Sequence, residues 1–265
     1  MRLVERIDSG LNRLLLFELE DGYTVEGVHF RDDTLCVSTQ VGCSVRCRFC
    51  ASGKPGLLRN LSAEEIIRQY LIAREVFPIR RIAVAGIGEP LHNWENVKKA
   101  FSFFRKEGLR VSFYTTGYPI RALDELLSIP HNGVSISIHA LRPDRRRKIM
   151  PFAGSVERLL EYLRNRLPLL SRRKRKKVSL AYLLLGGIND SPRDLFELGN
   201  VAKELGVSIT LLYPNEVKEE WAIGEERYER AFRFLRGMGV KVTLSTRFRR
   251  DKIGGCGTLS VGVQV

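Results

Sequence analysis

The stretch that decides the fold runs from residue 35 to residue 50 and reads Leu35-Cys36-Val37-Ser38-Thr39-Gln40-Val41-Gly42-Cys43-Ser44-Val45-Arg46-Cys47-Arg48-Phe49-Cys50. Apolar and polar residues alternate up to Val41, which predicts a strand that ends at Gly42. Downstream, Ser62-Ala63-Glu64-Glu65 is a capping box that predicts a helix to about Phe77. The three cysteines lie between the strand and the helix. In a parallel α/β barrel this is the face that carries the active site.

The spacing C-x3-C-x2-C of Cys43, Cys47 and Cys50 predicts an iron–sulfur site. Three thiolates can bind three irons of a [4Fe–4S] cluster and leave the fourth iron open to a small cofactor. This arrangement is typical of radical S-adenosylmethionine (SAM) chemistry, and an aromatic residue, Phe49, precedes the last cysteine as is usual there. The alternative is zinc, which prefers four protein ligands, often as two separated pairs. The sequence has no second close pair of Cys or His.

Composition limits the class of protein. The chain has 265 residues, 44% of them hydrophobic, a formal net charge of +14 and five cysteines. It has no apolar run of membrane-spanning length and no signal-peptide core, so we expect a cytoplasmic protein that is not bound to a membrane. An odd number of cysteines, three of them within eight residues, suits metal ligation in a reducing compartment better than structural disulfides.

Strand and helix patterns alternate after the cysteine loop, and we expect a partial (β/α)6 barrel, open at one side, within a single domain. The core spans 34–214, a small β extension with a hairpin around Asp21-Gly22 spans 1–33, and a segment carrying Cys256 spans 215–265. The other predicted strands begin at Ile82, Val111, Val134, Val178 and Val207. The predicted helices are Trp94–Lys106, Ile120–Ser128, Val156–Leu169, Pro192–Leu205 and about Glu225–Arg236, with a last strand at about Val240–Thr246.

Positive charge gathers in three blocks, Arg142–Lys148, Arg172–Lys177 and Arg247–Lys252. Each block alone reads as a solvated surface run, and Arg172–Lys177 as an exposed loop. Together they indicate a polyanionic partner, most simply a nucleic acid.

Two further features point to a SAM enzyme. Gly86-Ile87-Gly88-Glu89-Pro90 follows the second barrel strand, where glycines allow a ligand close to the backbone and an exposed carboxylate can pair with an ammonium group. Cys36 lies on the strand that leads to the cysteine loop, and Cys256 is flanked by Gly254, Gly255 and Gly257. Two lone thiols are more often small buried hydrophobes, but a glycine-flanked thiol is a plausible nucleophile.

These residues resemble the radical SAM adenine C2-methyltransferases that act on 23S rRNA and tRNA (the RlmN/Cfr-like family). The resemblance extends from about Leu15 to about Leu259 and includes all five cysteines. Its other motifs are Arg59-Asn60-Leu61, Leu91-His92-Asn93 after Pro90, Ser137-Ile138-His139-Ala140, Gly187-Ile188-Asn189-Asp190 and Gly255-Cys256-Gly257-Thr258-Leu259. The family's accessory N-terminal domain is not found before the hairpin. The resemblance therefore supports the family's chemistry for this chain more strongly than it supports the family's substrate.

The resemblance implies a role for each matched residue. Cys43, Cys47 and Cys50 would hold a [4Fe–4S] cluster, and Gly88, Glu89, Ser137 and Asn215 would contact SAM. Cys256 would carry a methyl group that is transferred to adenine C2. Cys36 would then release the product by forming a disulfide with Cys256. Glu26 would be an acid or base near the substrate. The implied partners are rRNA or tRNA and an external electron donor such as flavodoxin or ferredoxin, with no obligate protein partner evident.

Two other functions remain open from the residues. The first is a radical SAM enzyme that acts on another RNA, a peptide or a small molecule, against which the presence of both Cys36 and Cys256 counts. The second is a non-catalytic iron–sulfur or zinc protein that binds RNA. The segment Gly86–Pro90 counts against the second, since a binding module needs no SAM site.

Overall fold

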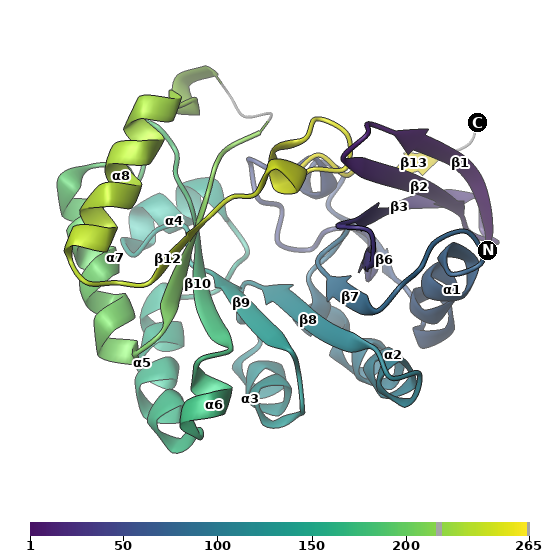
Figure 1. The fold of residues 1–265 in the computed structure, drawn as a ribbon, viewed down its shortest axis with the longest axis horizontal. Coiled ribbons are helices and arrows are strands. Elements are labelled where there is room, and N and C mark those ends of the chain that lie inside the picture. The colour runs from purple at the N-terminus through teal and green to yellow at the C-terminus, as the bar shows by residue number, and fades with distance from the viewer. Residues whose placement is uncertain (216–218, 264–265) are drawn as a thin grey trace.

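The fold is centred on a curved sheet with helices packed against its outer face, as the computed structural model shows for the residues that it describes, 1–215 and 219–263 (Figure 1). Seven strands run parallel in the order β4, β7, β8, β9, β10, β11, β12. Their bounds are Thr34–Val37 (β4), Arg81–Val84 (β7), Arg110–Thr115 (β8), Gly133–Ser137 (β9), Val178–Leu183 (β10), Ser208–Leu212 (β11) and Val242–Leu244 (β12). The predicted partial barrel is confirmed, and β12, which lies within the last predicted strand, joins the six barrel strands as a seventh.

The helices that cover the sheet follow their capping signals. They are Ala63–Ala73 (α1), Trp94–Lys106 (α2), Ile120–Ser128 (α3), Pro143–Ile149 (α4), Val156–Arg166 (α5), Arg172–Arg175 (α6), Pro192–Leu205 (α7) and Glu225–Gly237 (α8). The capping box of Ser62 and Glu65 is formed at the start of α1. The α7 helix ends at Gly206, whose φ of 65° is the left-handed conformation that favours glycine. A side-chain cap opens α1, α5, α6 and α7, whereas the starts of α2, α3, α4 and α8 have none among the described residues.

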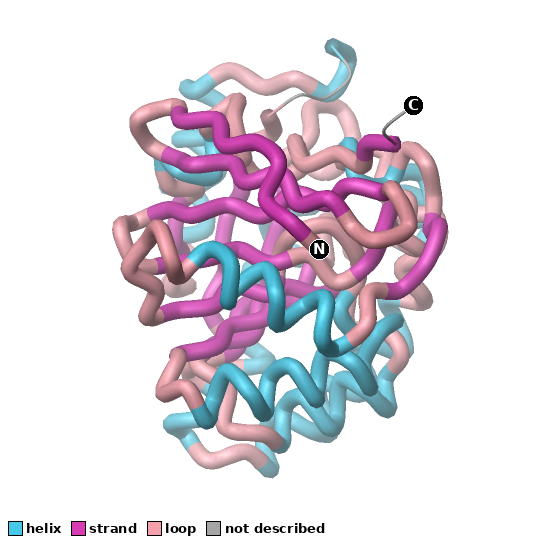
Figure 2. Tube along the Cα trace, turned by 90° about the vertical axis from the view of Figure 1, so that its right-hand side faces the viewer, coloured by secondary structure: helices cyan, strands magenta, loops and turns pink. Residues whose placement is uncertain are grey.

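The N-terminal residues form an antiparallel meander joined to the barrel sheet. The predicted hairpin is confirmed as β2 (Asn12–Glu18) paired with β3 (Tyr23–Phe30), and β1 (Arg2–Asp8) adds a strand to it. The β3 strand also pairs antiparallel with β4, and near its start with β13 (Gly262–Val263). Figure 2 shows this side of the molecule, where the N-terminus lies against the strands above a layer of helices. The division of the chain after residues 33 and 214 stays a prediction.

The predicted strand over 35–41 is wrong in one respect, because the chain leaves the sheet after Val37. The hydroxyl of Ser38 donates to the carbonyl of Glu26 (2.6 Å) and accepts from the amide of Ile87 (2.8 Å). Residues Gln40–Gly42 then form a separate strand, β5, which pairs antiparallel with β6 (Leu57–Asn60). The alternation of apolar and polar residues continues past Val37, but the backbone there pairs with a different strand.

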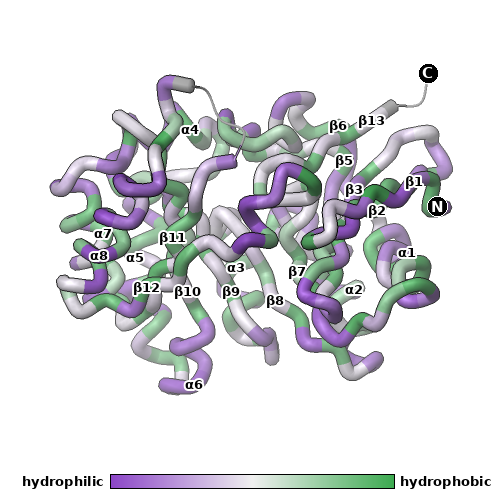
Figure 3. Tube along the Cα trace, turned by 45° about the horizontal axis from the view of Figure 1, so that its top comes forward, coloured by the Kyte–Doolittle hydropathy of each residue, from purple (hydrophilic) through white to green (hydrophobic). Residues whose placement is uncertain are grey.

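The prediction of an exposed loop at Arg172–Lys177 is also wrong in part. Residues Arg172–Arg175 form the short helix α6, whose first turn is capped by the Ser171 hydroxyl accepting from the amide of Lys174. Because α6 precedes β10, it lies at the amino edge of the parallel sheet, opposite the edge where the cysteine loop follows β4. Figures 1 and 3 show α6, rich in hydrophilic residues, away from the C-terminal segment.

Candidate active site

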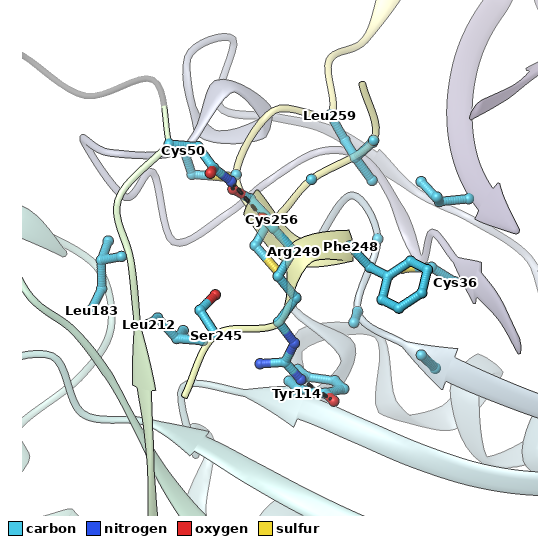
Figure 4. Close-up of a pocket in the computed structure, with 18 of the residues that line it drawn as sticks. Cys36, Cys50, Tyr114, Leu183, Leu212, Ser245, Phe248, Arg249, Cys256 and Leu259 are labelled. Carbon is cyan, nitrogen blue, oxygen red and sulfur yellow. Dashed lines mark hydrogen bonds between the residues drawn. The ribbon is translucent and has the colours of Figure 1, made fainter. Parts of the chain in front are cut away.

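A cavity of about 210 Å³ opens at the carboxyl edge of the barrel strands. Its wall includes five residues expected at the site and several to which the sequence analysis assigned no role. The expected ones are Cys36, Cys50, Ser137, Asn215 and Cys256; the others include Phe30, Tyr114, His139, Phe248 and Arg249. Figure 4 shows Cys36 and Tyr114 on the barrel strands, and Arg249 and Cys256 on the C-terminal segment that crosses above them.

The cysteine loop lies in an apolar setting. Cys43, Cys47 and Phe49 pack against a buried cluster made of Val45, Ala140, Ile149, Met150, Ala153, Leu183, Leu185, Ile188 and Trp221. Burial raises the pKa of the Cys43 thiol to about 12 and that of Cys47 well above its ordinary value. Without a cation these thiols would therefore stay protonated. A metal that binds them supplies the charge that thiolates need.

The donor set fits an iron–sulfur cluster in its chemistry. Three thiols come from one loop, and each of Cys43 and Cys50 disfavours a charge on Cys47, so the three lie near one another. Within residues 1–215 and 219–263, no three His, Cys, Asp or Glu side chains converge so that they could share one metal ion. The cysteine ligands of a [4Fe–4S] cluster need not converge on one metal ion, because each thiolate binds a separate iron.

The Gly86–Pro90 segment is fastened to the start of the cysteine loop. Gly88 has a φ of 110°, and a Cβ there would meet the Gln40 side chain at 2.7 Å, so only glycine fits. The amide of Glu89 donates to Oε1 of Gln40 (2.9 Å). The prediction of an exposed carboxylate is wrong, because Glu89 is only 3% exposed.

Glu89 is held by donors from the end of β8 and from its own segment. Its carboxylate accepts from the hydroxyl of Thr115, from the amide of Thr116 (2.8 Å) and from the amide of Leu91 (3.2 Å). Burial nevertheless raises its pKa. An ammonium group beside this carboxylate would favour its charged form. Its role as a SAM contact stays a prediction.

Of the predicted SAM contacts, Ser137 and Asn215 line the cavity, whereas Gly88 and Glu89 are not among its lining residues. Ser137 is the last residue of β9. Asn215 follows β11, and its amide nitrogen donates to the backbone carbonyls of Arg249 and Cys256, both at 2.7 Å. Asn215 therefore positions the Cys256 segment, a connection that the sequence did not predict.

Cys36 and Cys256, far apart in the sequence, line the same cavity as free thiols. Cys36 is buried on β4, whereas Cys256 is exposed to the cavity. Burial raises the pKa of Cys36 to about 12, and the Arg249 guanidinium opposes that rise. Arg249 stacks over the ring of Tyr114, 4.9 Å from its centroid, and donates to its hydroxyl at 2.5 Å. Arg249 therefore places a fixed positive charge near both thiols.

Glu26 lies outside the cavity wall. Its carboxylate accepts from the amide of Ser260 at 2.8 Å, and burial raises its pKa. It thus fastens the segment that follows Cys256 to β3. Its predicted role as an acid or base stays a prediction.

Arg146 corrects the interpretation of Arg142–Lys148 as a solvated run. It is 2% exposed, and its guanidinium donates to the backbone carbonyls of Ile138, of Ser137 (3.1 Å) and of Ala153 (3.3 Å). Its charge also favours the thiolate of Cys47. A run of like charges gave no sign that one member is buried beside the cysteine loop.

The pattern of a family described as "Radical SAM superfamily" matches residues 37–199. The chain belongs to that superfamily. Radical SAM proteins use a [4Fe–4S] cluster and SAM, and the cysteine loop described above lies within the matched range. None of the described helices is both long and apolar enough to span a bilayer.

Relatives of this radical SAM chain include proteins named as RNA methyltransferases. A probable RNA methyltransferase of Rhodopseudomonas palustris is 36% identical over 228 residues, which are 81% of this chain and 61% of the relative. A probable dual-specificity RNA methyltransferase RlmN of Desulforamulus reducens is 36% identical over 259 residues, which are 92% of this chain and 73% of the relative. Within the superfamily, the chain therefore belongs to the RlmN-related family.

Two solved structures share the fold of this chain. A radical SAM methyltransferase from Sphaerobacter thermophilus superposes with a TM-score of 0.87 at 28% identity, covering 97% of this chain and 80% of that one. The Streptococcus suis protein SuiB, solved bound to S-adenosylmethionine, has a TM-score of 0.62 at 13% identity, which shows a shared fold alone.

Proposed function

We propose that the protein transfers a methyl group to C2 of an adenine in RNA, either 23S rRNA or tRNA, by way of a methylated Cys256. One observation carries the proposal: Cys36 and Cys256 line a single cavity together with Cys50 of the cysteine loop. A radical SAM protein acting by hydrogen abstraction alone needs no such pair of thiols. The names of the relatives support RNA as the substrate.

The chemistry explains why two thiols are needed. C2 of adenine is not nucleophilic, so direct displacement of a methyl group from a sulfonium is unfavourable there. A thiolate is a good nucleophile, and Cys256 is exposed to the cavity and held by its amide donating to the carbonyl of Arg249 at 3.0 Å. Cys256 is therefore placed to accept a methyl group from SAM by displacement.

The cluster would be held by Cys43, Cys47 and Cys50. When bound, it would supply the electron that cleaves SAM, and this cleavage would allow a hydrogen atom to be abstracted from a methyl C–H bond. Methylated Cys256 would provide this bond, and the hydrogen atom would go to the 5′-deoxyadenosyl fragment of SAM, which becomes 5′-deoxyadenosine. The carbon of methylated Cys256 then bonds to adenine C2, which leaves the base joined to the protein. The aromatic ring is restored when a one-electron acceptor takes up one electron, which balances the electron spent on cleaving SAM, and a base takes up the C2 proton.

Cys36 would complete the reaction. Its Sγ attacks Sγ of Cys256, so that an S–S bond forms and the S–C bond breaks. The electron pair of the broken bond goes to the carbon on the base, which takes up a proton and becomes the methyl group. The disulfide must then be reduced by two electrons from an external dithiol, whereas flavodoxin or ferredoxin is the expected donor of the electron that cleaves SAM.

The test compares the two cysteine variants after anaerobic reconstitution with iron and sulfide. Protein purified with SAM available should carry one extra methyl group at Cys256, seen by mass spectrometry of the intact chain and its peptides. Cys256→Ala should lose this mass and all methylated RNA yet keep the cluster. Cys36→Ala should accumulate protein covalently joined to RNA.

Two thiols with only a structural role would behave otherwise. Each alanine variant would then be mildly destabilised, by about 1 kcal/mol, and would otherwise be alike in activity. An unmodified Cys256 together with full activity in both variants would end the proposal. 5′-Deoxyadenosine formed from SAM without any Cys256 methylation would point to a different radical SAM substrate.

A further inference from the structure

One arginine is buried beside the cysteine loop without a carboxylate partner. Arg146 belongs to α4 and is only 2% exposed. Its neighbour Arg145 pairs with the carboxylate of Asp194 at 2.7 Å, whereas none of the described residues brings a carboxylate within ion-pair distance of Arg146. Taking a charge out of water is costly, so a buried cation normally has a counter-charge beside it. The carboxylates of the described residues do not supply one for Arg146.

Neutral acceptors hold the Arg146 guanidinium in place. Its Nη1 donates to the carbonyls of Ser137 (3.1 Å) and Ile138, and its Nη2 donates to the carbonyl of Ala153 (3.3 Å). Its Nε is buried and has no hydrogen-bond acceptor within the part of the chain that the structure describes. The three bonds fix the position of the positive charge, but backbone carbonyls carry no net charge and do not neutralise it.

The cysteine loop packs against the end of the same helix. The amide of Arg48 donates at 2.9 Å to the carbonyl of Ile149, the last residue of α4. Cys47 packs against the buried cluster that contains Ile149 and Ala153, and Ala153 is also one of the acceptors of Arg146. The fixed charge and the middle cysteine of the loop therefore lie around one helix end.

The two side chains also act on each other's ionisation. Burial lowers the pKa of Arg146 to about 10, and the charge that most opposes this change is that of the Cys47 thiolate, ahead of Tyr118 and Glu89. Burial raises the pKa of Cys47 well above its ordinary value, and Arg146 opposes that rise. Each group thus favours the charged form of the other. The thiolates of the loop provide the counter-charge that Arg146 lacks.

Reduction changes the charge that this arginine faces. An electron that enters a [4Fe–4S] cluster adds a negative charge, and the net charge around the cluster is one of the quantities that set its reduction potential. Charges interact more strongly in a protein interior than in water, so a buried cation has a larger effect than an exposed one. A fixed positive charge beside Cys47 therefore favours the reduced cluster over the oxidised one.

We propose that Arg146 raises the reduction potential of the cluster held by Cys43, Cys47 and Cys50. It acts as a positioning residue, because its hydrogen bonds hold one positive charge beside the loop. That charge eases the transfer of one electron to the cluster from an external one-electron donor such as flavodoxin or ferredoxin. The inference goes beyond the proposed function, since it concerns the reduction that precedes any methyl transfer and holds for any substrate.

The test is a redox titration of the reconstituted holoenzyme at pH 7, followed by the electron paramagnetic resonance signal of the reduced cluster. Arg146→Met keeps an apolar side chain of similar length but removes the charge, so the midpoint potential should become more negative. The equilibrium constant for reduction should fall about 10-fold or more, as it does for ionisation of a group that loses an adjacent opposite charge. Arg146→Lys keeps the charge but loses most of the donors, and its potential should stay near that of the parent.

The matched control is Arg147→Met. It removes the same charge from the next residue of α4, which is exposed to solvent, and should leave the potential near that of the parent. Urea unfolding of each holoenzyme measures the structural role of Arg146 separately. Arg146→Met and Arg146→Lys should both be less stable, because each leaves buried carbonyls without donors. Stability should therefore follow the hydrogen bonds, whereas the potential should follow the charge.

The contrary outcomes are distinct. A parent-like potential in Arg146→Met would overturn the proposal, and so would an equal shift in Arg146→Met and Arg146→Lys, or in Arg146→Met and Arg147→Met. Arg146→Gln is a second neutral variant, and iron and sulfide are measured in every preparation. If neither neutral variant held a cluster that Arg146→Lys holds, a role in cluster binding would replace the proposed one.

The proposed function is measured in the same preparations by a different signal. Methylation of Cys256 by displacement takes no electron from the cluster, so mass spectrometry of that residue does not depend on the potential. An unmethylated Cys256 together with the expected shift in potential would reject the proposed function alone. A methylated Cys256 together with an unchanged potential in Arg146→Met would reject only the role of Arg146.

Discussion

At the scale of single residues, Arg249 connects the two thiols that the proposed reaction needs. It is held from below by the hydroxyl and ring of Tyr114, and its backbone carbonyl accepts from both the amide of Cys256 and the side chain of Asn215. One residue thus fixes a charge with its side chain and a nucleophile with its backbone. Sequence reasoning missed it because it lies in a basic run that reads as solvated surface.

Replacing Arg249 should make Cys36 harder to ionise. Burial already raises the pKa of that thiol to about 12, and removal of the cation that opposes the rise should move it higher. The rate at which Cys36 reacts with a small thiol reagent between pH 8 and 10 should therefore fall in Arg249→Met. Arg249→Lys should recover part of the rate, because the charge remains. Reaction rates that match the parent at every pH in both variants would show that the guanidinium does not act on this thiol.

At the scale of elements, the starts and ends of helices were largely predictable. The bounds of α2, α3 and α7 agree with the sequence patterns, because a cap, a proline at the first turn or a glycine at the end is read from adjacent residues. The break between β4 and β5 was not predictable, since it depends on Ile87, which supplies backbone partners from a distant loop.

The capping box of α1 gives a measurable test of this local control. The Ser62 hydroxyl accepts from the amide of Glu65, and the Glu65 carboxylate accepts from the amide of Ser62. Ser62→Ala should lower the free energy of unfolding by about 1 kcal/mol, measured by urea denaturation. Ser102→Ala within α2, whose hydroxyl donates only to the Lys98 carbonyl one turn earlier, should cost much less. Equal costs would mean that the box does not stabilise the helix end.

At the scale of the whole molecule, the barrel and the cysteine site follow from the sequence, but the cavity does not. Phe30 and Phe248 come from opposite ends of the chain, and no local pattern brings them together. Charge was also a poor guide to position. Of the three basic blocks, one contains the buried Arg146, one lies at the far edge of the sheet and one lines the cavity.

A buried histidine predicts how the molecule responds to acid. His131 is 2% exposed, and neither of its ring nitrogens has a hydrogen-bond partner among the residues that the structure describes. Burial lowers its pKa to about 4. Between about pH 6.5 and pH 4 the unfolded chain therefore binds more protons at this site than the folded chain. Stability is complete above pH 6.5 and is lost as the pH falls toward 4, by up to about 3 kcal/mol from this group.

His131→Leu should weaken this dependence. Urea unfolding at pH 7, 6, 5 and 4.5 should give a shallower fall in the free energy of unfolding than in the parent. A residual slope is expected from His139, whose pKa burial lowers to about 3 and whose Nδ1 accepts from the amide of Leu183. An unchanged slope in the variant would assign the acid sensitivity to other groups.

The pairing of β13 with β3 has a consequence for the order in which the molecule is built. Residues 254–259 close the cavity, and the strand that follows them joins one that is formed near the start of the chain. Contacts between such distant positions form late, and during synthesis they must wait until the distal residues have been made. A nascent chain can thus carry a folded barrel and a complete cysteine loop while Cys256 is still missing from the cavity. The thiol that would receive the methyl group arrives last, so the half-made protein has no acceptor in place.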